Sequence, residues 1–263
     1  MLHRRIALGL EYDGSRFEGW QTQPHGRTVQ DLLERALSAF AEEELATICA
    51  GRTDAGVHAC GQVAHFDTLR QREEYSWVRG VNRFLPAHIA VRWARYVAAD
   101  FHARYSARAR HYEYWIWNHA VRSPLLEGRA GWVFRDLNVP AMQSAAVQLL
   151  GTHDFSSFRS AQCQSASAVR TVVRCDVQRI DSQLVRVRVS ANAFLHHMVR
   201  NLVGALVAVG TGRHSAQWMA QVLQARDRSQ AAATIEAAGL YLMGVEYDAS
   251  CGLPQPEQRL LFR

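Results

Sequence analysis

The order of strand and helix patterns constrains this chain most, because a similar order occurs twice along the sequence. In the first occurrence, large apolar residues stand at every second position, Ile6, Leu8, Leu10 and Tyr12, which is the period of a strand. Thr28 then precedes a run whose apolar residues recur at helical spacing, with Asp31 in its first turn. Further strand patterns follow at residues 46–50, 62–66, 89–97 and 110–117. This half of the chain therefore predicts a helix together with several strands.

The second occurrence begins with a helix pattern that starts at Asn138. A hairpin with its turn at 181–183 follows, and then a strongly apolar helix pattern over residues 194–209. A last helix and a last strand complete the pattern. We expect an α+β fold with a mixed, mostly antiparallel sheet flanked by helices, in two similar halves, 1–120 and 121–263.

The basic residues exclude several functions, because all 30 are arginine and the chain has no lysine. Lysine Schiff bases, pyridoxal phosphate attachment and P-loop nucleotide binding all require an amine that is absent. A coding bias toward arginine explains the missing lysine but not where the arginines lie. The net charge of +6 and the pI near 9.4 favour a polyanionic partner.

Neither a membrane location nor a cysteine framework is indicated. The five cysteines are scattered without a CxxC pair, so the sequence predicts neither disulfides nor a zinc site. No apolar run approaches the length that crosses a bilayer, and residues 1–5 lead directly into a strand pattern instead of a signal peptide. We expect a cytoplasmic protein with no membrane association.

One carboxylate, Asp54, stands out in the stretch GRTDAGVH, on a connection between two predicted strands. A rigid frame positions side chains in such a loop while they remain reachable. The neighbouring Arg52 favours the ionised carboxylate, which suits a nucleophile or a base better than a general acid. The alternative is an aspartate that only bonds its own turn.

Residues 100–114 interleave arginines with aromatic residues. Guanidinium groups bind phosphates and aromatic faces stack on unpaired bases, so this pattern favours a nucleic acid whose bases are exposed. We expect Arg104, Arg108 and Arg110 to contact phosphates. The alternative is a solvated strand pair with aromatic core residues.

Arg200 lies in the apolar helix pattern, in line with His196 or His197 and with Gly204 at helical spacing. A guanidinium buried without a partner is unfavourable, so Arg200 should face a carboxylate or a phosphate. Asp54 is one candidate partner, and a structural ion pair with another acid is the alternative.

The 12 histidines show no metal-ligand pattern and no cluster of acids accompanies them, so we expect no metal and no cofactor. A two-metal nuclease would need several convergent carboxylates, which the sequence does not supply.

Several long motifs, in order, resemble those of the tRNA pseudouridine synthase A (TruA) family. They are YDGSRFEGWQ (12–21), GRTDAGVHACGQVAHF (51–66), VNRFLPAHIAV (81–91), DFHARYSARARHYEYWI (100–116), DFSSFR (154–159), NAFLHHMVRNLVG (192–204) and GLYL (239–242). The resemblance implies the pseudouridine synthase fold and an enzyme that isomerises uridine to pseudouridine in tRNA. It further implies action on the anticodon stem-loop, at positions 38–40, by a homodimer in which both halves form one catalytic unit.

The same resemblance assigns roles to individual residues. It implies that Asp54 is the catalytic aspartate, that Arg52 helps to bind and flip the target nucleotide, and that Arg200 pairs with the aspartate. It also implies that Tyr112 stacks on the uracil and assists proton removal from C5. Leu240 then belongs to the wall of the uridine pocket.

Two other functions compete with this interpretation: an inactive RNA-binding protein of the same fold, and a metal-dependent nuclease. The joint presence of Asp54, Tyr112 and Arg200 favours the synthase. The sequence does not separate an aspartate that attacks the sugar from one that acts as a base on a glycal-type route.

Overall fold

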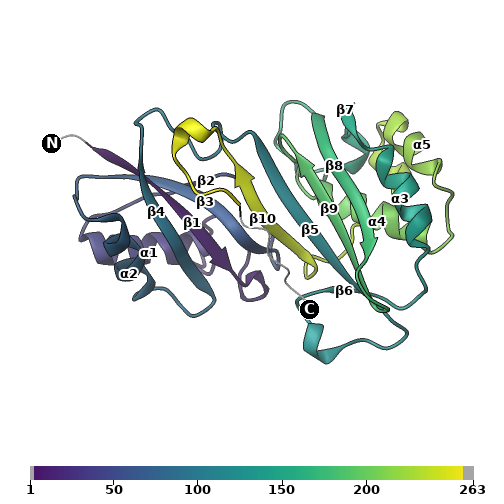
Figure 1. Cartoon of the computed structure of the whole chain (residues 1–263), viewed down its shortest axis with the longest axis horizontal. Coiled ribbons are helices and arrows are strands. Elements are labelled where there is room, and N and C mark those ends of the chain that lie inside the picture. The colour runs from purple at the N-terminus through teal and green to yellow at the C-terminus, as the bar shows by residue number, and fades with distance from the viewer. Residues whose placement is uncertain (1–2, 257–263) are drawn as a thin grey trace. The chain divides into compact units, whose positions relative to one another are not determined.

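The computed structural model describes residues 3–256, which form two compact units (Figure 1). The first unit comprises residues 3–110 and 241–256, and the second comprises His111–Leu240. The described residues include five α-helices and ten strands, and most of the strand pairs are antiparallel. The predicted α+β class, with a mixed, mostly antiparallel sheet flanked by helices, is confirmed.

The first unit is a sheet with two helices. Its strands are β1 (Arg4–Tyr12), β2 (Ile48–Cys49), β3 (His58–Thr68), β4 (Ile89–Val97) and most of β10 (Leu240–Glu246), and its helices are α1 (Val29–Ala41) and α2 (Glu74–Asn82). The strand order is β4-β1-β3-β10, with β2 also paired to β3. β1 is antiparallel to β3 and β4, whereas β10 runs parallel to β3 with Tyr241 opposite His58.

Local sequence explains the start of this unit. The alternating Ile6, Leu8 and Leu10 are at most 1% exposed, and Ala7 between them is also fully buried, so the middle of β1 is buried on both faces. α1 begins with a capping box, in which Thr28 accepts a hydrogen bond from the Asp31 N–H and the Asp31 carboxylate accepts one from Thr28 N–H. Both features follow from residues close together in the sequence, and both predictions are confirmed.

The second unit is also a sheet with helices. Its strands are β5 (Ala109–Asn118, from His111 onward), β6 (Gly131–Val133), β7 (Gly151–Asp154), β8 (Val169–Arg179) and β9 (Leu184–Ala191), and its helices are α3 (Val139–Val147), α4 (Met198–Gly210) and α5 (Trp218–Ala225). The order is β5-β9-β8-β7, and β6 pairs in parallel with β5. The predicted hairpin is confirmed, because β8 and β9 are antiparallel and joined at Asp181.

Two helices differ from the sequence prediction. α2 has no counterpart in it, and α4 begins at Met198 rather than at Phe194. The later start follows from the backbone of His197, whose φ of 62° lies in the left-handed region and interrupts the helical run. Among the described residues, no helix combines the length and the apolar character needed to span a bilayer.

Candidate active site

Asp54 lies in the first unit, on the connection of residues 50–57 between β2 and β3, here called the Asp54 loop. Residues of the YDGSRFEGWQ motif (12–21) hold the backbone of this loop in place. The hydroxyl of Tyr12, at the end of β1, lies 2.8 Å from the Thr53 hydroxyl, and the Trp20 N–H donates to the Thr53 carbonyl at 3.0 Å. Asp54 itself is partly exposed. The backbone beside this reachable carboxylate is therefore held by residues that lie far before it in the chain.

Two glycines of the same motif allow the Asp54 loop to approach closely. A Cβ on Gly14 would lie 1.9 Å from the Val57 carbonyl oxygen, and one on Gly19 would lie 3.0 Å from the Thr53 oxygen. Gly19 also has a φ of 88°, which disfavours any other residue. The Gly14 N–H donates to Nδ1 of His58, directly after the loop, at 3.1 Å. The spacing of these glycines in YDGSRFEGW thus serves the loop that carries Asp54.

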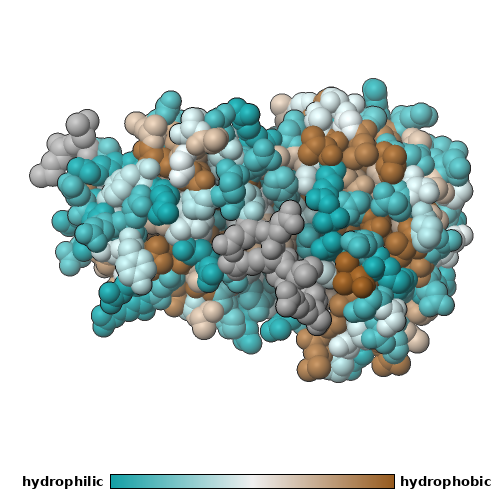
Figure 2. Space-filling view, viewed as in Figure 1, coloured by the Kyte–Doolittle hydropathy of each residue, from teal (hydrophilic) through white to brown (hydrophobic). Residues whose placement is uncertain are grey.

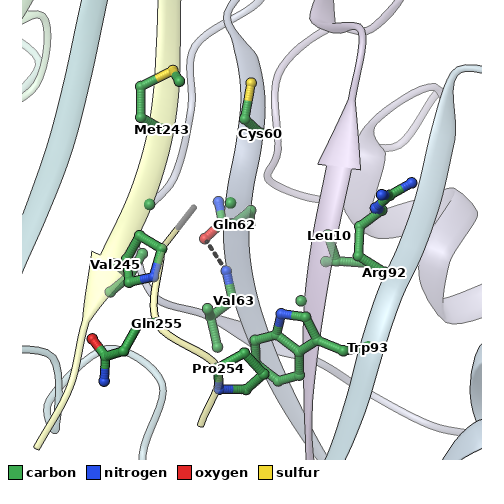
Figure 3. A pocket seen from close by; sticks show the side chains of 14 residues that line it. Leu10, Cys60, Gln62, Val63, Arg92, Trp93, Met243, Val245, Pro254 and Gln255 are labelled. Carbon is green, nitrogen blue, oxygen red and sulfur yellow. Dashed lines mark hydrogen bonds between the residues drawn. The ribbon is translucent and has the colours of Figure 1, made fainter. Parts of the chain in front are cut away.

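Gln62, on β3, fixes the other end of the Asp54 loop. Its side-chain amide donates to the Gly51 carbonyl at 2.7 Å, while its oxygen accepts the Val63 N–H at 3.1 Å (Figure 3). Gln62 also lines a hollow in the first unit, formed by residues of β1, β3, β4, β10 and the segment 254–256 (Figure 3). None of the predicted site residues lines that hollow.

The three arginines of the 100–114 motif lie in the first unit and differ in exposure. Arg104 and Arg108 are exposed, and Arg108 forms an ion pair with Asp248. Arg110 is only 8% exposed, and its guanidinium donates to the carbonyls of Ala50 at 2.9 Å and Arg104 at 2.6 Å. Arg110 therefore connects the start of the Asp54 loop to the turn that carries Arg104. Arg52, within the loop, is exposed.

Arg200 lies in the second unit, in the first turn of α4. Its Nε donates to the carbonyl of Ile235 at 2.9 Å, and the Ile235 N–H faces the Arg200 carbonyl at 3.5 Å. Gly204, one turn later, permits this approach, since a Cβ there would lie 2.3 Å from the Ala233 oxygen. The predicted alignment of Arg200 with Gly204 is confirmed, and the segment 233–236 covers both positions.

The segment 233–236 also contacts β5, the strand of Tyr112. The Tyr114 hydroxyl donates to the Glu236 carbonyl at 3.0 Å. Burial raises the pKa of Tyr114, and the nearby charge of Arg200 acts in the opposite direction. Tyr112, two residues earlier on β5, is buried with its ring nearly perpendicular to that of Phe194, 5.1 Å between centroids. One segment thus links the strand of Tyr112 with the helix of Arg200.

Leu240 ends the second unit and is buried. Its N–H donates to the Ala237 carbonyl at 2.9 Å. The preceding Gly239 is enclosed, because a Cβ there would meet the Trp115 carbonyl at 2.4 Å. Side-chain volume before Leu240 is therefore restricted by the backbone of β5.

The helix-face prediction for His196 and His197 is wrong, because both residues precede α4. Their ring centroids lie 4.0 Å apart with a tilt of 36°. His197 has a left-handed backbone conformation, and α4 begins at the next residue. A histidine pair before an apolar run gave no local signal for this turn.

Sequence reasoning missed Asn201, which is fully buried in α4 beside Arg200. Its amide donates to the Phe158 carbonyl at 2.8 Å, and its oxygen accepts the Thr234 hydroxyl at 2.6 Å. Asn201 therefore anchors the same 233–236 segment that contacts Arg200. A lone amide within an apolar helix pattern was the available signal.

Comparisons with known proteins support the motif resemblance. The family model described as tRNA pseudouridine synthase matches residues 10–106 and 145–248. The chain is 56% identical over 258 residues to tRNA pseudouridine synthase A of Herminiimonas arsenicoxydans, covering 97% of this chain and 94% of that protein. It is 58% identical over 253 residues to the protein of that name from Bordetella parapertussis (95% and 93% covered), and 57% over 250 residues to that of Burkholderia lata (95% and 92%).

A solved structure of a Cbf5-Nop10-Gar1 complex covers 90% of this chain and 48% of the matched chain, with a TM-score of 0.36 and 12% identity. A likeness at that level adds nothing to the assignment. The assignment follows from the family model, which matches most of the chain in two stretches, and from relatives that are more than half identical over nearly its whole length. This chain belongs to the tRNA pseudouridine synthase family.

Proposed function

We propose that this protein isomerises uridine to pseudouridine in tRNA and that Asp54 is its catalytic carboxylate. The supporting observation is the Asp54 loop, in which a partly exposed aspartate stands on a backbone fixed by Tyr12, Trp20 and Gln62. A carboxylate held in place before the substrate binds loses little free energy to reorganisation when it reacts. The loop thus fits a reaction that depends on one positioned acid.

The reaction needs no redox partner. The N1–C1′ bond breaks, the uracil turns, and C5 bonds to C1′; C5 then loses its proton and N1 gains one. Asp54 can serve as the nucleophile at C1′ or as the base that opens a glycal-type route. Tyr112 is proposed to stack on the uracil and to assist removal of the C5 proton. Arg200 is proposed to pair with the aspartate, and Leu240 to form the wall of the uridine pocket.

The substrate proposal is the anticodon stem-loop of tRNA, at positions 38–40. The target base must leave its stack to react, and Arg52 beside Asp54 is proposed to bind and flip it. The exposure of Arg104 and Arg108 fits phosphate contacts. The burial of Arg110 and its bonds to backbone carbonyls favour a positioning role over a phosphate contact.

Three broader proposals accompany this function and rest on the family resemblance. The halves 1–120 and 121–263 act together as one catalytic unit, the protein works as a homodimer, and it acts in the cytoplasm. The net charge of +6 suits a tRNA partner.

The test replaces Asp54 by asparagine, which keeps the shape of the side chain and removes its charge. With tRNA tritiated at uridine C5, we expect Asp54→Asn to abolish tritium release while tRNA binding persists. Asp100→Asn removes an exposed charge from the same unit and should leave the rate unchanged. Full activity of Asp54→Asn would remove that residue from the mechanism.

Excess EDTA separates the nuclease alternative from the synthase. Isomerisation with intact RNA in chelator supports the proposal, whereas chelator-sensitive strand cleavage supports a metal-dependent nuclease. Binding without any isomerisation in the wild-type protein would favour the inactive RNA-binding protein. Nucleoside mapping of the treated tRNA then identifies the modified position.

A further inference from the structure

The 100–114 motif carries four aromatic residues, and the structure separates one of them from the others. Phe101 is 5% exposed, Tyr112 8% and Tyr114 fully buried, whereas Tyr105 is 75% exposed. A tyrosine ring that is three-quarters accessible stabilises little by burial. The exposed ring is therefore available to a partner, unlike the other three.

Tyr105 lies on a turn that is ordered by its own side chains. The Nδ1 atom of His102 accepts the N–H groups of Arg104 and Tyr105, each at 3.2 Å, and the Ser106 N–H donates to the His102 carbonyl at 2.9 Å. The His102 ring lies 4.3 Å from the Tyr105 ring with a tilt of 32°. The Tyr105 ring is thus held in place by its contact with the His102 ring, while most of its surface remains exposed.

An arginine accompanies this ring. The guanidinium carbon of Arg104 lies 5.6 Å from the centroid of the Tyr105 ring, and Arg104 is itself exposed. Residues 101–110 contain no carboxylate and three arginines. On the face shown in Figure 2, apolar residues over the first unit are scattered among hydrophilic ones. A cationic surface around one aromatic ring fits an anionic aromatic ligand better than an apolar protein surface.

Arg110 couples this turn to the Asp54 loop. The same guanidinium nitrogen donates to the carbonyls of Arg104 and Ala50, so the turn and the start of the loop share one buried donor. The charges of Arg52 and Arg104 both act on the Cys49 thiol at the end of β2, although burial dominates and raises its pKa to about 12. Arg52 and Arg104 therefore lie around the same strand end.

We propose that Tyr105 and Arg104 form a stacking site for an unpaired nucleobase of the RNA and its phosphate, beside the nucleotide on which Asp54 acts. This subsite rests on the proposed function for its RNA ligand and adds a base contact outside the reacting uridine. Tyr105 supplies the face on which the base stacks, and the guanidinium of Arg104 donates hydrogen bonds to the phosphate. The site recognises an aromatic base without reading its edge, so it favours unpaired over paired nucleotides rather than one base over another.

The experiment uses a short single-stranded RNA with 2-aminopurine at its centre, whose fluorescence is quenched by stacking. We expect Tyr105→Leu to weaken binding about tenfold and to lose the quenching, and Tyr105→Phe to retain both. Tyr75→Leu is the matched control, because Tyr75 is a 68% exposed tyrosine of the same unit, on α2, and should change neither signal. Arg104→Gln should lower the salt slope of binding by about one.

Two results would refute the proposed stacking site. One is a Tyr105→Leu protein that binds and quenches like the wild type. The other is a Tyr105→Phe protein that loses as much affinity and quenching as Tyr105→Leu does. A change of oligomeric state in Tyr105→Leu, measured by sedimentation, would assign the ring to a contact between copies instead. Failure of the proposed function is distinguishable, because Asp54→Asn should lose tritium release and keep the quenching. A catalytically active wild type without quenching would reject the stacking site alone.

Discussion

Gly14→Ala tests whether the YDGSRFEGWQ motif positions the Asp54 loop. The added Cβ would lie 1.9 Å from the Val57 oxygen and 2.4 Å from its carbonyl carbon. Real Cβ atoms essentially never come closer than 3.0 Å, so the contact must open by about 1.1 Å. Both neighbours are backbone atoms, and no side-chain rotation relieves the clash. The end of the Asp54 loop or the 3-10 turn at Gly14–Arg16 must therefore move.

A displacement of this size should reduce catalysis more than stability. Misplacing a reacting group by about 1 Å costs on the order of 100-fold in rate, and overpacking costs roughly 1–3 kcal/mol of folding free energy. We expect kcat/KM for tritium release from C5-labelled tRNA to fall about 100-fold. Urea unfolding should show that the Gly14→Ala protein remains folded.

The control is Gly51→Ala in the same loop. A Cβ on Gly51 meets no described atom within 4 Å, and its φ lies outside the left-handed region. We expect wild-type activity and a change in unfolding free energy within about 0.5 kcal/mol. The reasoning is refuted if folded Gly14→Ala keeps kcat/KM within about twofold, or if Gly51→Ala is equally impaired.

Two further predictions concern folding. Asn201→Ala removes the buried amide that donates to the Phe158 carbonyl, and should lower the unfolding free energy by about 1–3 kcal/mol in urea titrations. Ser144→Ala, at an exposed position of α3, should change it little. Burial, followed by the charge of Arg5, lowers the pKa of His65 from 6.5 to about 4. The unfolded chain therefore binds more protons between these values, so stability should fall as pH drops from 6.5 toward 4, and His65→Gln should flatten that slope.

The sequence predicted correctly those elements whose sequence pattern lies within a few neighbouring residues. The alternation in β1 and the capping box of α1 each depend on residues within a few positions of one another. The turn between β8 and β9 is likewise local, because the Asp181 carboxylate accepts the N–H groups of Gln183 and Leu184. The motif resemblance identified the family, and the family model and the relatives confirm it.

Elements that depend on distant contacts were missed. α2 begins after Glu73 without a side-chain cap bond, so its start has no local signal. Its Gly80 lowers helix propensity, yet a Cβ there would lie 1.9 Å from the Phe40 ring, so close packing against α1 requires glycine. Only the packed structure shows why that helix contains a residue that disfavours helices.

The arginines of the 100–114 motif show the same limit at the candidate site. Sequence treats Arg104, Arg108 and Arg110 alike, because their side chains have the same chemistry. The structure leaves the first two exposed and buries the third, whose donors satisfy carbonyls at the ends of two separate segments, Ala50 and Arg104. A planar guanidinium suits this task, because it presents several donors in fixed directions, which a lysine ammonium does not. Under the proposed function, the exposed arginines would meet RNA from a turn whose position is already fixed, and we expect the buried one to contribute to binding through geometry rather than through charge.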